Sequence, residues 1–144
     1  MKRFIAILAV VFGVTFAASA EEKAIEVSQL PKAAQEFIST HFGTVAVLRA
    51  HSDKDILDVD YEVRLEDGTE IDFDSDGEWM EVKNKHLGIS KSFIPEEIVT
   101  YAETNYAKQK IVAIDRGPRD YEIELSNGLE LTFSIDGQLV AIDD

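Results

Sequence analysis

The sequence contains no cysteine, and it carries only 14 lysines and arginines against 28 aspartates and glutamates. Without cysteine, the chain has no disulfide, no thiolate zinc site, no cysteine nucleophile and no lipid-attached N-terminal cysteine. The formal net charge of -14 disfavours a nucleic-acid backbone or an anionic membrane surface as a partner, because like charges repel over the whole approach. Cationic partners are compatible with this charge.

Catalytic motifs are also missing from the sequence. It has no G-x-S-x-G, no H-E-x-x-H and no phosphate-binding loop. Its histidines, His41, His51 and His86, have no neighbours at metal-binding or triad spacing. Acids are so numerous that any carboxylate pair chosen for glycoside hydrolysis would be uninformative. The sequence therefore predicts a protein that is not an enzyme and needs no cofactor.

The chain does have enough apolar sequence to fold. Its 144 residues suit one compact domain, and a hydrophobic fraction of 45% with 8 phenylalanines is too high for a disordered chain.

The first twenty residues are typical of a secretory signal peptide. Met1-Lys2-Arg3 is a short positive start, residues 4–17 are almost entirely apolar, and Ala18-Ser19-Ala20 offers small residues for cleavage. A membrane-spanning anchor would need a run of about 20 apolar residues, and this run is shorter. We expect residues 1–20 to be removed and the remainder to be periplasmic or secreted, with no membrane insertion after cleavage.

The remainder of the chain contains an internal repeat. Residues 61–73 align with residues 121–133 at an offset of 60, through shared tyrosine, glycine and phenylalanine positions. We expect a first repeat at residues 21–83, a crossover at 84–93 and a second repeat at 94–144.

Each copy predicts one helix followed by four strands. Apolar residues recur at helical spacing after Pro31 and Pro95, and proline is favourable at the first position of a helix. Between Leu57 and Leu65 apolar and charged residues alternate, as in a strand with one buried face. We therefore expect an α+β fold of two tandem helix-plus-four-stranded antiparallel units. They would form one eight-stranded sheet with both helices on one face and the other face open.

Turn chemistry sets the register of the central hairpin in each copy. A three-residue loop at Glu66-Asp67-Gly68 places Val63 opposite Ile71, so that all apolar residues share one side. A two-residue loop would set each apolar residue opposite a charged one. Ser126-Asn127-Gly128 predicts the same register in the second copy.

These motifs resemble the PepSY-like proteins, exported bacterial proteins grouped by fold with the β-lactamase-inhibitor protein. The residues that carry the resemblance are Leu30-Pro31, Phe37, Phe42, Tyr61-Glu62-Val63, Asp67-Gly68, Phe73 and Asp76-Gly77-Glu78-Trp79. The resemblance spans nearly all of residues 29–143. It implies helices on one side of a sheet and a free opposite face, which in the inhibitor protein grips an enzyme. It supplies no catalytic residues.

Acidic side chains dominate the positions that face away from the predicted helices. They are Asp58, Asp60, Glu62, Glu70, Asp72 and Asp74 in the first copy, and Glu122, Glu124 and Glu130 in the second. The register sets Asp60 opposite Asp74 and Glu62 opposite Asp72, and such opposed like charges destabilise a sheet by about 0.2–1 kcal/mol per pair. Either a cation or a basic protein surface binds this face, or the charges only keep a solvated face soluble.

Asp72, Asp74 and Asp76 resemble the opening of a calcium loop, D-x-D-x-D-G. The twelfth position of such a loop should be a bidentate glutamate, and here it is Lys83. A strand that runs into an Asp-Gly hairpin turn explains the same residues.

The side of the sheet on which Trp79 lies depends on the turn at Asp76-Gly77. A two-residue turn points Trp79 outward, opposite Asp74, where it would anchor a partner. A three-residue turn packs Trp79 against Phe73 and points Glu81 inward, where burial of a charge is costly. We expect the outward position.

The sequence therefore predicts an exported, non-enzymatic protein whose open acidic face engages a protein or peptide, in the manner of an inhibitor. The alternative is a binding protein for calcium or another small cation, held by Asp60, Glu62, Asp72 and Asp74.

Overall fold

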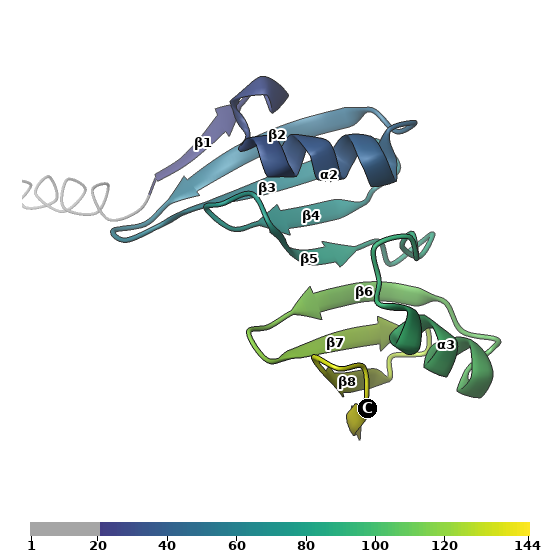
Figure 1. The fold of residues 1–144 in the computed structure, drawn as a ribbon. Coiled ribbons are helices and arrows are strands. Elements are labelled where there is room, and N and C mark those ends of the chain that lie inside the picture. The colour runs from purple at the N-terminus through teal and green to yellow at the C-terminus, as the bar shows by residue number, and fades with distance from the viewer. Residues whose placement is uncertain (1–20) are drawn as a thin grey trace, which may run out of the picture.

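A computed structural model describes residues 21–144, and in this part of the chain a single antiparallel sheet of nine strands runs through the whole molecule (Figure 1). The strands lie across the sheet in sequence order. They are β1 (Glu21–Ile25), β2 (Val47–Lys54), β3 (Val59–Leu65), β4 (Glu70–Phe73), β5 (Trp79–Lys83), β6 (Ile111–Arg116), β7 (Asp120–Leu125), β8 (Glu130–Ser134) and β9 (Leu139–Asp143). The predicted signal peptide at residues 1–20 lies outside the described residues.

Two helices cover one face of this sheet (Figure 1). A short 3-10 helix, η1 (Val27–Gln29), precedes α2 (Lys32–Phe42), and α3 (Glu96–Asn105) lies between β5 and β6 in the chain. The helices contribute Ala34, Ile38, Phe42, Ile98 and Ala102 to the core. Neither helix in the described part of the chain is long and apolar enough to cross a membrane.

The predicted fold of two tandem helix-plus-four-strand units in an eight-stranded sheet is wrong. The structure has one nine-stranded sheet, and within residues 21–144 the additional strand β1 has no counterpart in the second half. β1 is held by backbone pairing along the edge of β2, from Glu21 opposite Lys54 to Ile25 opposite Ala50. Hydrophobic periodicity detects strands that bury one face, and among the β1 side chains only Ile25 packs against the core.

The predicted register of the central hairpins is confirmed. Val63 pairs with Ile71, and the second hairpin repeats this pairing at an offset of 60. Both turns contain a glycine in the left-handed region, Gly68 with φ 94° and Gly128 with φ 93°. The outcome is a fully buried row of apolar side chains on the helix side of the sheet.

The turn between β4 and β5 corrects the prediction for Trp79. Phe73 pairs with Trp79, and a β-bulge at Met80 then restores the alternation, so that Val82 also faces the core. Trp79 is only 7% exposed, and the expectation that it lies on the open face is wrong. The extra residue in β5 lets Trp79 and Val82 both face inward while Glu81 stays outside, which neither simple turn allows.

The Trp79 ring packs among aromatic residues from both halves of the chain. Its centroid lies 6.2 Å from that of Phe37, 5.3 Å from that of Phe93 and 6.4 Å from that of Tyr121. Arg116 lies over the ring, with its guanidinium carbon 4.5 Å from the centroid. Its Nε and Nη2 donate to the Trp79 carbonyl oxygen at 3.0 and 2.7 Å. Arg116 thus satisfies a carbonyl beside the bulge, where the ladder is disrupted.

Replacing Gly77 with alanine is expected to destabilise the protein more than the same change at Gly128. Both glycines have positive φ, 86° and 93°, which other residues rarely adopt. A Cβ at Gly77 would lie 2.7 Å from the Cβ of Pro31 and 3.0 Å from the nitrogen of Ala34, whereas nothing lies within 4 Å at Gly128. In urea unfolding we expect losses of about 3 kcal/mol for Gly77→Ala and about 1 kcal/mol for Gly128→Ala. Equal losses would contradict the close approach of this turn to α2.

Candidate functional site

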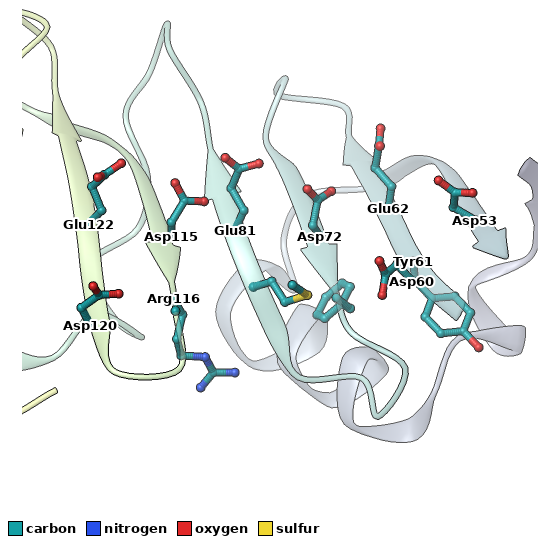
Figure 2. Close-up of a pocket in the computed structure, with 13 residues that line it drawn as sticks. Asp53, Asp60, Tyr61, Glu62, Asp72, Glu81, Asp115, Arg116, Asp120 and Glu122 are labelled. Atoms are coloured by element: carbon teal, nitrogen blue, oxygen red, sulfur yellow. The ribbon is translucent and has the colours of Figure 1, made fainter. Parts of the chain in front are cut away.

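Five carboxylates lie in one line across the face of the sheet opposite the helices (Figure 2). The register pairs Glu62 with Asp72, Asp72 with Glu81, Glu81 with Asp115, and Asp115 with Glu122. We call these five residues the acidic row, which crosses the adjacent strands β3 to β7. Opposed residues in antiparallel strands have Cβ atoms about 4.5–5.5 Å apart, so every member of the row has a like charge beside it.

The acidic row lies in a hollow of about 480 Å³ on the open face. The other residues that line this hollow are Asp53, Asp60, Tyr61, Phe73, Met80, Arg116, Gly117 and Asp120. Eight of the lining residues are acids and one is a base, Arg116. That base is already engaged, because it binds the Trp79 carbonyl and lies 3.6 Å from a Glu78 carboxylate oxygen. The hollow therefore presents a concentrated negative charge.

The crowding raises the pKa of members of the acidic row. Partial burial, the charges of Glu81 and Glu62 and a hydrogen bond with Glu81 raise the pKa of Asp72 to about 7. Partial burial also raises the pKa of Asp115 to about 6, with Glu81 and Glu122 as the acidic neighbours. Burial and neighbouring acids raise the pKa of Glu122 as well. Near neutral pH the row therefore holds protons that an approaching cation would displace.

A second line of outward residues is neutralised by bases. Glu70 contacts Arg64, with 2.7 Å between Oε1 and Nη1, and Lys83, with 3.4 Å between Oε2 and Nζ. Glu124 forms an ion pair with Lys85. The predicted site residues Glu70 and Glu124 are thus members of ion pairs, and the like charge of this face is concentrated in the acidic row.

The remaining predicted site residues lie at the margins of the hollow or beyond it. Asp58 is exposed in the turn between β2 and β3, Asp60 lines the hollow from β3, and Glu130 is exposed on β8. Trp79, predicted to belong to this face, belongs to the core.

The three aspartates of the predicted calcium loop do not lie together in one site. Asp72 belongs to the acidic row on β4, whereas Asp74 and Asp76 lie in the turn that follows. Asp74 Oδ1 accepts hydrogen bonds from the backbone N–H groups of Asp76 and Glu78, each at 2.9 Å, and so stabilises the turn. Within residues 21–144, no three acidic or histidine side chains are grouped so as to hold a metal ion.

Residues 59–141 match the family described as "Putative beta-lactamase-inhibitor-like, PepSY-like". The chain belongs to this family. No curated protein matches this chain.

Solved structures of similar proteins come from Bacteroides. A "putative calcium-regulated periplasmic protein" from Bacteroides thetaiotaomicron is 40% identical with a TM-score of 0.82, over 85% of this chain and 97% of that one. A "putative periplasmic protein from DUF2874 family" from Bacteroides vulgatus is 38% identical with a TM-score of 0.81, over 86% and 98% of the two chains. A third, also from Bacteroides vulgatus and described as of unknown function, is 36% identical with a TM-score of 0.80, over 86% of this chain and 100% of that one.

In this PepSY-like protein, sequence reasoning identified Glu62, Asp72 and Glu122 of the acidic row and missed Glu81 and Asp115. Glu81 follows the bulge, and its outward direction could be inferred from the sequence only through its neighbour Val82. Val82 aligns with an apolar residue of the second repeat and is therefore expected to face the core. Asp115 ends a run of apolar residues in β6. Its place in the row depends on the pairing of β5 with β6, and α3 separates these strands in the sequence.

Proposed function

We propose that this PepSY-like protein is an exported, non-enzymatic binding protein whose acidic row holds a cationic protein or peptide. The observation that carries the proposal is the line of five opposed carboxylates on the face that the helices leave open. Repulsion between opposed like charges lowers the stability of the free protein. A lysine or arginine side chain seated in the hollow would relieve this repulsion.

The similar proteins support the class of this proposal. The family is described as inhibitor-like, which favours binding over catalysis. The solved relatives are described as periplasmic, which supports export of this chain. The hollow itself contains carboxylates without a serine, cysteine or histidine to act as a nucleophile or base beside them.

A short cationic peptide tests the proposal. We expect a lysine-rich peptide of about ten residues to bind the protein one to one in isothermal titration calorimetry at low salt, because an open strand face and a carboxylate row suit an extended basic chain. Glu81→Gln combined with Asp115→Asn should weaken binding about tenfold.

The matched control removes two acids elsewhere. Glu36→Gln combined with Glu66→Gln changes the net charge equally at exposed positions outside the hollow. If this control weakens binding as much as the row variant does, attraction is only general and the proposed site is refuted.

Calcium binding at the same row is the second candidate. One solved relative, at 40% identity, is described as calcium-regulated. Carboxylate oxygens are the ligands that calcium prefers, although in this structure the row would have to rearrange to surround an ion. Titration with CaCl2, with MgCl2 as the comparison, should give heat that Glu81→Gln abolishes. No heat at millimolar calcium would exclude this candidate.

A further inference from the structure

The turn between β2 and β3 exposes two large apolar side chains at the end of a projecting hairpin. Ile56 and Leu57 are each 89% exposed, more than any other large apolar residue in the described part of the chain. Figure 1 shows that the β2–β3 hairpin extends beyond the ends of β4 and β5. Single exposed apolar residues are ordinary, but two adjacent ones at a projecting tip form an apolar surface that is left exposed to solvent.

The fold does not require these two residues. The turn is closed by the Asp55 backbone N–H, which donates to the Asp58 carbonyl oxygen at 2.9 Å. The Asp55 carboxylate also accepts from the Ile56 N–H at 2.7 Å. Tight turns favour glycine, asparagine, aspartate or serine, and a β-branched isoleucine is a poor choice at such a position. The turn therefore carries isoleucine and leucine for a reason other than its own geometry.

Aspartates surround this apolar tip. Asp53, Asp55, Asp58 and Asp60 flank it in the sequence, with Lys54 as the only base among them. Partial burial and the charges of these neighbours and of Asp74 raise the pKa of Asp60. Asp53 and Asp60 also line the hollow that contains the acidic row, so the charge around the tip is continuous with the site described above.

We propose that the Ile56-Leu57 tip inserts into an apolar recess of a partner protein whose rim is basic, while the acidic row binds further basic residues of the same partner. The inference rests on the proposed function and names the kind of partner that the site accepts. Charge complementarity selects this occupant. An anionic membrane and a second copy of this acidic chain would both place negative charge against the aspartates around the tip.

Photocrosslinking in the cell envelope tests the proposal. A photoreactive diazirine side chain is placed at Leu57 in the full-length protein, and at Leu87, which is 60% exposed in the segment between β5 and α3, as the control. We expect one crosslinked protein from position 57 and none of it from position 87. The captured protein is then identified, purified and titrated against the purified variants.

Affinity for the purified partner decides the outcome. Ile56→Ser combined with Leu57→Ser should leave the melting temperature unchanged and weaken binding at least about tenfold, whereas Leu87→Ser should not. Asp53→Asn combined with Asp58→Asn should slow association at low salt. Unchanged affinity of the tip variant would overturn the inference. Three other results would also overturn the inference. They are the absence of a crosslinked product from position 57, a crosslinked product that is a second copy of this chain, and flotation of the wild type but not of the tip variant with anionic phospholipid vesicles.

The same titration separates this inference from the proposed function. Binding lost in Glu81→Gln with Asp115→Asn but retained in the tip variant refutes the tip alone. Binding retained in both refutes the acidic row as well.

Discussion

Trp79→Ala is expected to lower the free energy of unfolding by about 3–5 kcal/mol, the usual cost of removing a large buried aromatic side chain. The indole is 7% exposed and packs against Phe37, Phe93 and Tyr121. Its loss would leave a cavity between the first half of the chain and β7, and it would also remove the ring over which Arg116 lies. Urea unfolding followed by circular dichroism measures this effect.

The neighbouring residue supplies the matched control. Met80 is 41% exposed at the bulge, so Met80→Ala should cost much less than Trp79→Ala. In the wild type, acrylamide should quench the fluorescence of Trp79, the only tryptophan, weakly. Strong quenching, or equal losses for the two variants, would contradict the position of Trp79 in the core.

The protein should become less stable as the pH rises from 5 to 8. The pKa values of Asp72 and Asp115 are raised to about 7 and about 6, from 3.8 for each in the unfolded chain. The folded protein therefore binds more protons than the unfolded chain in this range, and stability falls as these groups ionise. Both groups remain partly open to solvent, so we expect a loss of about 2 kcal/mol rather than the full value of the shifts.

Glu81→Gln tests the cause of this pH dependence. Glu81 lies opposite both Asp72 and Asp115 and raises the pKa of each. At pH 8 its neutralisation should stabilise the protein by about 1 kcal/mol and flatten the pH profile. Glu66→Gln, at an exposed turn position, should leave the profile unchanged. A wild-type protein whose stability is level or rises between pH 5 and 8 would show that the acidic row is not strained.

The sequence was sufficient to predict the features that depend on burial and on turn chemistry. Val63 could face only the core, and Gly68 closes the only loop that sets it opposite an apolar residue, so the hairpin register followed. Outward acids such as Glu62 and Asp72 followed from the same alternation. These interactions are local, and each residue type has one acceptable position.

Features that depend on distant backbone could not be predicted in this way. Beside the bulge at Met80, Arg116 from the other half of the chain donates hydrogen bonds to the Trp79 carbonyl oxygen. β1 exists because the edge of β2 is available to it. Neither interaction is visible in the periodicity of its own segment, and the errors over the position of Trp79 and the number of strands come from this source.

The order of the strands has a consequence for how the protein is made. Because β1 to β9 are neighbours in space in the order of their synthesis, each strand can pair with the edge of the strand formed before it. Only the connections that contain α2 and α3 are long, and the other neighbouring strands are joined by short turns, which favours rapid folding. A chain that forms its strands from the N-terminus onward would thus expose each unpaired strand edge only briefly.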